Sequence, residues 1–457
     1  MRRTPVLVVL LLLSTLALLP GTARAKGPSV GAELNRLQDD GELDAATADS
    51  YRTVYDDARK TLKKLTGFRR VQLRAVVANV DAAARAHLFA PSRLKAEFLT
   101  LQRNRAWWSA APLPYAGQRH TFAGSQVVWQ FYPGQGWQIQ WLATFGKANA
   151  LWMVKTRDAD LRRLLDEALG LATQRAGGIA FEYLFKFDRG QPPWVSGLAQ
   201  GTALSALSRA AVRLKDTRYF DAARSALGIF KTPPPAGIAR PTSHGTHYLQ
   251  YSYAPELRIV NGFTQALNGL HDFAALANDA EGRALFASGE QALRAELPGF
   301  DTGAWSLYSK PGAESNLNYH KVLRDFLQGL CDRMTADPAG PSPKLYCDTA
   351  QRFTADLTTK PKLEITAPST PLRARRAAHV AFTLSKISTV TITARRAGRL
   401  VLDRSARLAY GHHLISVKPS QAGPLVVRVA ATDLAGNANA TQVTLHVRPS
   451  AKKRGGV

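Results

Sequence analysis

The chain has 457 residues, with 60 lysines and arginines against 34 aspartates and glutamates, and a formal net charge of +26 at pH 7. At about 150 residues per domain, this length predicts two or three folding units rather than one core. The excess of positive charge indicates an anionic partner, although a dispersed basic surface with no specific partner is the simpler alternative. We expect no membrane span, because no internal stretch approaches the roughly 20 apolar residues that a transmembrane helix needs.

The N-terminus has the three parts of a secretory signal peptide. Arg2 and Arg3 precede an apolar run over residues 6–19, and Gly21 to Ala25 then form a small-residue cleavage site. Residues 1–25 are therefore predicted to be removed, and the mature protein is expected to be secreted or extracytoplasmic, with association to the cell envelope left open. An exported basic protein meets acidic polysaccharide more readily than nucleic acid, so we expect an anionic polysaccharide partner and no nucleic acid.

The sequence pattern in the first half of the chain changes from helical to strand-like at Trp107. Residues 26–106 are rich in Ala, Leu, Arg and Lys at helical spacing and predict three or four helices, the last starting at Pro91. Residues 107–150 instead interleave aromatic side chains with Gly, Pro and Gln. This segment predicts a β-rich insert with turns at Pro133-Gly134 and near Gly136, and its exposed rings would stack on sugars.

Helical periodicity returns over residues 151–358. Paired helices joined by irregular loops predict an α/α barrel (toroid), whose cleft would be built from the loops at one rim. The fold class is therefore mainly α. The expected helical segments are 157–175, 194–215, 217–229, 256–278, 282–297, 316–335 and 344–355, with Pro255 in the first turn of the fourth.

Period-two alternation replaces the helical pattern after Pro361. Residues 362–448 contain several strand-like runs separated by turns, which predict an immunoglobulin-like β-sandwich. Residues 449–457 form a basic tail that is expected to be disordered. A sandwich of this kind would bind a wall or a partner, or act as a spacer.

The two cysteines, Cys331 and Cys347, permit two interpretations. In an oxidising compartment they are compatible with a disulfide between neighbouring helices, and the alternative is two buried thiols. Neither has a His or Cys partner at ligand spacing, so we expect no metal site.

Two loops before helices concentrate ring and amide side chains. The first contains His247, Tyr248, Gln250, Tyr251 and Tyr253. The second runs from Phe300 through Asp301-Thr-Gly303, Tyr308 and Lys310 to Tyr319-His320. Tyrosines before a helix often bury a ring and keep the hydroxyl hydrated, which is the simpler explanation of either loop alone.

These loops belong to a set of motifs that resembles a known family in order and spacing. The motifs are Trp194-Val-Ser-Gly-Leu-Ala-Gln-Gly201, the Tyr251 loop with Val260-Asn-Gly-Phe263, Leu267-Asn-Gly-Leu270, Asp301-Thr-Gly303 with Tyr308, and Tyr319-His320. Together they resemble the C-terminal catalytic domain of D-glucuronyl C5-epimerases, the enzymes of heparan sulfate maturation, over roughly residues 190–335. Trp137-Gln-Ile-Gln140 is similar to the family's preceding β-rich segment. We expect an exported bacterial homologue.

The resemblance implies a C5-epimerase of D-glucuronate-type residues in an acidic polysaccharide, without a cofactor or metal. It makes Tyr319, Tyr308 and Tyr251 the catalytic tyrosines. It makes Lys310, Arg258 and His320 the candidates for holding the substrate carboxylate. The further substrate-binding candidates in the matching motifs are Trp137, Gln140, Trp194 and Asn261. Inversion at C5 needs a base and an acid on opposite faces of the ring and a neutralised carboxylate, which suits these residue types.

One position departs from the family pattern. Animal members carry an acidic residue, proposed as a base, where this chain has Gln250. A neutral amide cannot abstract a proton, so either His247 or a tyrosine takes that role, or activity is altered or lost. His247 has the ordinary pKa best suited to titrate near neutral pH.

Two rivals to the epimerase remain open. A polysaccharide lyase of the same fold class makes the same C5 abstraction and then eliminates the 4-O substituent. A catalytically inactive glycan-binding protein is the non-enzymatic alternative. The sequence names neither the polymer nor its sulfation, and it leaves open whether the protein is a homodimer.

Overall fold

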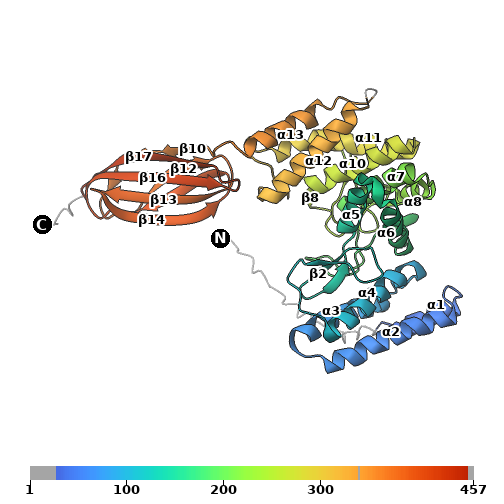
Figure 1. The fold of residues 1–457 in the computed structure, drawn as a ribbon. Coiled ribbons are helices and arrows are strands. Elements are labelled where there is room, and N and C mark those ends of the chain that lie inside the picture. Colours follow the sequence, from blue (N-terminus) through green and yellow to red (C-terminus); the bar gives the residue numbers. More distant parts are fainter. Residues whose placement is uncertain (1–26, 338–339, 451–457) are drawn as a thin grey trace, which may run out of the picture.

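The computed structural model describes residues 27–337 and 340–450, so the predicted signal peptide and most of the basic tail lie outside the described residues. The chain begins with four helices that lie together at one end of the molecule, away from the C-terminal strands (Figure 1). They are α1 (Val30–Asp39), α2 (Ala45–Lys64), α3 (Gly67–Arg85) and α4 (Pro91–Ala110). Ser29 and Asp44 cap α1 and α2 by accepting from backbone amides, and Pro91 starts α4, where its missing N–H costs nothing.

A small antiparallel sheet follows, made of β1 (Arg119–His120), β2 (Trp129–Tyr132) and β3 (Gly136–Ile139). Phe131 pairs with Trp137 in the β2–β3 hairpin. Gly136 has a φ of +72°, and a Cβ there would come within 2.4 Å of Asn104 Oδ1, so this turn requires glycine. Asn104 Oδ1 accepts from the Trp137 backbone N–H at 2.8 Å, which fastens the hairpin to α4.

Three rings of this sheet are not available to the predicted sugar-stacking surface. Trp129 and Trp137 are fully buried and Phe131 nearly so, against α4 and against each other. Burying rings of this size contributes more than exposing them for stacking would, because each removes a large apolar area from water. Trp137, which was expected to bind substrate, is buried in this structure, and its role in binding stays a prediction.

The middle of the chain is built from helices with short strand pairs between them. These elements are α5 (Trp141–Met153), the 3-10 turn η1 (Lys155–Arg157), α6 (Asp158–Gly170), β4 (Thr173–Arg175), β5 (Gly178–Ala180), α7 (Gly197–Leu214), α8 (Arg218–Ser225), α9 (Gly228–Lys231), β6 (Ala239–Thr242), β7 (Gly245–Tyr248), β8 (Arg258–Ile259), α10 (Val260–Leu276), α11 (Ala280–Glu296), the 3-10 turn η2 (Leu297–Phe300), β9 (Ser309–Lys310), α12 (Leu317–Thr335) and α13 (Lys344–Asp356).

Helices α7 and α10 approach each other very closely through glycine. A Cβ on Gly201 would lie 2.6 Å from the Cα of Ala266, and one on Gly269 would lie 2.0 Å from the Gly201 carbonyl oxygen. No larger residue fits at either point without moving a helix. The glycines that stood out in the sequence motifs are thus packing positions, and they fix the helices whose N-terminal ends face the candidate site.

The fourth predicted helix begins later than expected. Pro255 lies in a turn, residues 258–259 form β8, and α10 starts only at Val260. The reason is a long-range pairing, because Arg258 and Ile259 pair with Lys310 and Ser309 of β9 and are drawn into extended backbone. This pairing joins the two loops that the sequence singled out.

Two sheets make the C-terminal region. One has the order β10-β12-β15 and the other β11-β17-β16-β13-β14. Their strands are β10 (Leu363–Thr366), β11 (Leu372–Arg373), β12 (Ala378–Leu384), β13 (Ser388–Arg396), β14 (Arg399–Leu408), β15 (Gly411–Val417), β16 (Gly423–Asp433) and β17 (Ala438–Arg448).

Side chains of both sheets share one apolar core between residues 372 and 447, separate from the helical core between residues 30 and 353. The coarse prediction of a mainly helical chain with a strand-rich C-terminal region is confirmed. The α/α-barrel and immunoglobulin-like assignments, and the domain boundaries, stay predictions.

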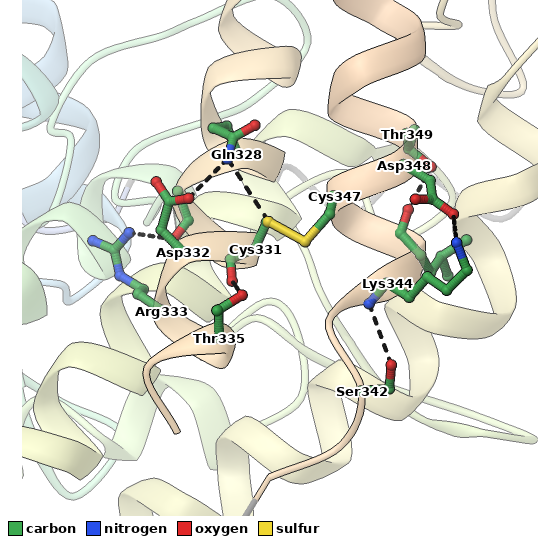
Figure 2. Close-up of a disulfide and its surroundings, with 12 residues drawn as sticks. Gln328, Cys331, Asp332, Arg333, Thr335, Ser342, Lys344, Cys347, Asp348 and Thr349 are labelled. Carbon is green, nitrogen blue, oxygen red and sulfur yellow. Dashed lines mark hydrogen bonds and ion pairs between the residues drawn. A yellow bond between two sulfur atoms is a disulfide. The ribbon is translucent and has the colours of Figure 1, made fainter. Parts of the chain in front are cut away.

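Cys331 of α12 and Cys347 of α13 form a disulfide with a Cα separation of 5.0 Å (Figure 2). The sequence left open a disulfide or two buried thiols, and the structure contains the disulfide. It ties together the last two helices, and α12 carries Tyr319 in its first turn. None of the described helices is long and apolar enough to cross a membrane.

Candidate functional site

A cavity of about 300 Å³ opens where the small sheet, the starts of α5 and α7, the Tyr251 loop and α12 meet. Three larger hollows lie elsewhere on the described residues, and no tyrosine lines any of them. The residues lining the smaller cavity are Arg119, Gln130, Tyr132, Gln140, Leu142, Tyr183, Phe187, Trp194, Ser196, Leu198, Gln250, Tyr251 and Tyr319. We call it the tyrosine cavity.

The three tyrosines that the resemblance singled out come together at this cavity. Tyr251 and Tyr319 line it, and the Tyr308 ring lies 4.7 Å from the Tyr319 ring, centroid to centroid. Tyr251 stacks on Tyr253 at 5.2 Å and meets the edge of Trp194. Tyr319 is the exposed member, with 43 % of its surface accessible. Aromatic residues far apart in sequence, from Trp194 to Tyr319, thus form one cluster.

Burial favours the protonated hydroxyl at Tyr251 and at Tyr308. Desolvation raises the pKa of both Tyr251 and Tyr308, and a negative charge on Tyr319 would raise both further. The amide of Gln250 faces the two hydroxyls and works in the opposite direction, lowering each pKa. Tyr251 and Tyr308 are therefore suited to donate a proton or a hydrogen bond rather than to abstract a proton.

Gln250 occupies a tight position beside the cavity. Its side chain lies against the start of α10, where a Cβ on Gly262 would come within 2.5 Å of Gln250 Oε1. That oxygen is buried and has no hydrogen-bond partner among the described residues. A buried acceptor without a partner is costly, which makes it a place for a donor from a ligand.

The structure places His247 away from the tyrosine cavity. Its ring is fully buried against Phe263, and its Nδ1 lies 2.8 Å from Glu296 Oε2. Burial lowers the pKa of His247, although Glu296 opposes that shift. His247 does not line the cavity, so it is not positioned as the base that the sequence suggested.

The predicted carboxylate-holding cations also lie outside the cavity lining. Arg258 Nη1 is 3.3 Å from Glu296 Oε1, and the ammonium of Lys310 lies over the Phe300 ring at 5.0 Å. The pKa of Glu296 is lowered, because the hydrogen bond from His247 and the charges of Arg258 and Lys310 outweigh its desolvation. Glu296 thus offsets the charge of Arg258 beside the β8–β9 pairing, and Lys310 lies nearby on β9.

His320 is a buried structural residue. Its ring stacks on Trp305 at 3.8 Å with planes 7° apart, its Nδ1 faces Ser306 Oγ at 2.9 Å, and its Nε2 faces the Phe353 carbonyl oxygen at 2.9 Å. Both ring nitrogens are occupied inside the protein, so neither is available to a substrate. Adjacent positions on a helix face different ways, and Tyr319 takes the side toward the cavity.

The remaining predicted residues divide between the cavity and the core. Gln140 and Trp194 line the cavity. Gln140 accepts a hydrogen bond from Tyr183 Oη at 2.8 Å and donates one to Tyr132 Oη at 2.7 Å. Asn261 is buried, and its Oδ1 accepts from the Gly262 backbone N–H at the start of α10.

Sequence reasoning missed Arg119, the only cation among the lining residues. It lies on β1, is exposed, and donates from Nε to Gln130 Oε1 at 3.3 Å. Tyr132, Tyr183 and Phe187 were missed as well. Their motifs carried no signal, because they reach the cavity only once the hairpin and the loop before α7 have folded. Among the described residues, no group of three His, Cys, Asp or Glu could hold a metal ion.

Residues 174–339 match the family model described as the C-terminus of D-glucuronyl C5-epimerase. This segment belongs to that family. It contains all three clustered tyrosines, whereas Arg119, Gln130, Tyr132 and Gln140 precede it. The matched segment therefore contributes part of the lining of the tyrosine cavity, and the small sheet and the start of α5 contribute the rest.

Two relatives match over part of their length. A D-glucuronyl C5-epimerase of Caenorhabditis elegans is 32 % identical over 151 residues, which cover 29 % of this chain and 24 % of that protein. An uncharacterized protein of Methanocaldococcus jannaschii is 29 % identical over 150 residues, covering 32 % of this chain and 48 % of that protein. The chain thus spans less than half the length of either relative.

Solved structures resemble the chain only distantly. A cellobiose 2-epimerase from Bacillus thermoamylovorans has a TM-score of 0.36 at 11 % identity, covering 63 % of this chain and 74 % of that one. An α-mannanase of Bacteroides thetaiotaomicron has a TM-score of 0.36 at 10 % identity, covering 52 % and 65 %.

Proposed function

We propose that the tyrosine cavity inverts C5 of uronosyl residues, of the D-glucuronate to L-iduronate type, in an acidic polysaccharide. The observation that carries this proposal is that Tyr251 and Tyr319 line one cavity together with a cation, Arg119, while Tyr308 packs against Tyr319. The reaction needs a carboxylate partner and two proton-transfer groups, and the cavity supplies residues of each type.

Arg119 is the residue we assign to the substrate carboxylate. Removing the C5 proton places negative charge on that carboxylate, and a planar guanidinium can hold both of its oxygens. Arg119 makes one hydrogen bond, to Gln130, and belongs to no ion pair among the described residues. Its charge is therefore available to a ligand.

The tyrosines divide the acid and base roles between them. We assign Tyr319, the exposed member, to proton abstraction as a tyrosinate. Tyr308 and Tyr251, whose pKa values burial raises, are assigned to proton delivery. Ionisation of Tyr319 raises the pKa of both neighbours, so a tyrosinate at Tyr319 favours protons on Tyr251 and Tyr308.

The substrate class follows from charge. An excess of basic residues, +26 over the whole chain, favours a polyanion, and a predicted signal peptide would bring the protein to extracellular polyuronates. The specific polymer and its sulfation are matters for experiment.

A glycan-binding protein without catalysis is the second candidate, and one observation favours it. No carboxylate or imidazole lies among the residues lining the cavity, and Gln250 stands where the family has an acidic residue. A binder would use the same cation and rings and would leave C5 untouched.

The test is incubation of the purified protein with a panel of polyuronates, heparosan-type polymers included. An epimerase changes the uronate configuration without creating an unsaturated product. A lyase instead produces ultraviolet absorbance from the new double bond. Binding to a polymer without either change would support the second candidate and contradict the first.

A further inference from the structure

Tyr308 lies on a compact loop, residues 301–316, between η2 and α12, which we call the Tyr308 loop. Backbone hydrogen bonds fold the loop onto itself. Leu307 N–H donates to the Phe300 carbonyl at 2.8 Å, Tyr308 N–H to the Ala313 carbonyl at 3.0 Å, and Ser315 N–H to the Ser306 carbonyl at 2.8 Å. Leu307 also pairs with Glu314 in an isolated bridge. The positions of Glu314 and Tyr308 are thus coupled through adjacent residues of one folded unit.

Glu314 joins this loop to the C-terminal sandwich. Its Oε1 accepts from the Ile387 backbone N–H at 2.7 Å, and its Oε2 accepts from the Tyr410 backbone N–H at 2.8 Å. Ile387 precedes β13 and Tyr410 precedes β15, so one carboxylate holds two separate turns of the sandwich. Only 7 % of Glu314 is exposed. Hydrogen bonds to a charged acceptor are stronger than neutral ones, and here they are shielded from water.

A buried ammonium reinforces the same contact. Lys386 and Asp433 are each 1 % exposed by side chain, and Lys386 Nζ lies 2.8 Å from Asp433 Oδ2. The ammonium also donates to the Asp356 carbonyl at the end of α13, at 2.7 Å, and lies 5.4 Å from the centroid of the Trp305 ring. Trp305 belongs to the Tyr308 loop and stacks on His320 of α12.

We infer that the C-terminal sandwich is a positioning element for the candidate site, holding the Tyr308 loop through Glu314 and Lys386. A spacer or an independently tethered module needs no charge at its junction. Burying a carboxylate and an ammonium is costly unless every partner is held in place, and here the partners come from the sandwich, the Tyr308 loop and α13. The sandwich thus holds the Tyr308 loop at Glu314 and lies beside its Trp305.

Hydrogen exchange of the full chain tests this inference. Glu314→Ala removes both acceptors and should speed amide exchange in peptides from residues 301–316 by at least about tenfold, since two hydrogen bonds to a charged group are lost. Protection in α7 should not change. Glu314→Gln keeps one carbonyl acceptor and should restore part of the protection. The matched control is Asp403→Ala, an exposed acidic residue on β14 of the same sandwich.

Lys386→Met gives a second route to the same answer if Glu314→Ala does not fold, because it removes the ammonium and keeps the length of the side chain. Equal protection of the Tyr308 loop in Glu314→Ala, Lys386→Met and Asp403→Ala would overturn the inference.

A kinetic readout rests additionally on the proposed function. If Tyr308 delivers a proton, Glu314→Ala should lower kcat for C5 exchange about tenfold or more and leave KM near the wild-type value, with Glu314→Gln intermediate. Loss of loop protection with an unchanged kcat would support the positioning of the loop and contradict the role of Tyr308. The two claims can therefore fail separately.

Discussion

Tyr308 and Tyr319 lie ring beside ring, with centroids 4.7 Å apart and planes at 43°, although one is on a loop and the other in the first turn of α12. Asn316 caps that helix by accepting a hydrogen bond from the Tyr319 backbone N–H at 2.9 Å. This bond fixes the backbone from which the Tyr319 ring projects. The pair is the centre of the proposed chemistry, and Tyr251 completes it.

Removing either hydroxyl should stop catalysis while sparing binding. Tyr319→Phe and Tyr308→Phe keep the rings and their packing, so each should lower C5 proton exchange by about 100-fold or more, the usual contribution of a general acid or base. Polymer affinity, measured by calorimetry, should change little. Tyr115→Phe, at an exposed tyrosine outside the cavity, is the control. Wild-type rates of C5 proton exchange in both variants would show that these rings only contribute to packing.

Arg119 should contribute to binding through its charge. Arg119→Ala should weaken polyuronate binding about tenfold, in line with the loss of hydrogen bonds to a charged group. Arg74→Ala removes an exposed cation from α3 and serves as the control for general electrostatic attraction. If the two variants lose the same affinity and show the same salt dependence, Arg119 has no special role at the site.

His247 should matter for folding rather than for chemistry. His247→Ala leaves Glu296 with one fewer buried partner, so the free energy of unfolding should fall by about 2 kcal/mol or more. C5 exchange per folded molecule should stay close to wild type, because His247 does not line the cavity. Thermal melts together with exchange rates corrected for folded fraction separate the two effects. Complete loss of exchange in a fully folded variant would restore His247 as the base.

Stability should decline as the pH falls below neutrality. Burial lowers the pKa of His320 from 6.5 to about 4, so the folded state favours the neutral ring. The associated stability is fully present above pH 6.5 and is lost as the pH falls toward 4, in total about 3 kcal/mol at 1.36 kcal/mol per pKa unit. Denaturant titrations at pH 7 and pH 4.5 measure the loss, and His320→Gln should show a smaller one. A His320 ring that titrates near pH 6.5 by NMR would contradict this account.

Gln250→Glu should move the pH profile if the cavity is catalytic. The new carboxyl would lie beside Tyr251 and Tyr308 in a position where the wild-type residue is only 6 % exposed, and desolvation should raise its pKa. The pH profile of C5 proton exchange in this variant should therefore show one additional ionisation, on its acidic side. A variant that is active beside a silent wild type would show that the natural protein is a binder.

Local motifs predicted the parts of the site that are set by nearby residues. The resemblance to the epimerase family singled out the loops bearing Tyr251, Tyr308 and Tyr319, because its motifs are short local runs of sequence. Arg119 could not, since its position depends on a hairpin folding against α4 and then meeting residues more than 60 positions later. The burial of His247 could not be predicted for a similar reason. Its partner Glu296 is 49 positions away, and no local pattern indicates that contact.

The same distinction explains the errors in the fold. Pro255 is a good first-turn residue, yet the pairing of Arg258 with Lys310 extends the chain and delays α10 to Val260. Tryptophan is a residue type that often stacks on sugars, and Trp137 was expected to do so. Its hairpin packs against α4 instead, and no part of the ring is exposed. Contacts distant in sequence overrode local preference in both places.

Deuterium incorporation at C5 tests the central claim most directly. The wild-type protein is incubated with a uronate polymer in deuterated water, and the sugar is read by NMR for deuterium and for configuration at C5. The account predicts deuterium at C5 in both uronate configurations, with the signal abolished by Tyr319→Phe. A polymer that binds the protein tightly yet retains its C5 proton in every uronate tested would contradict it.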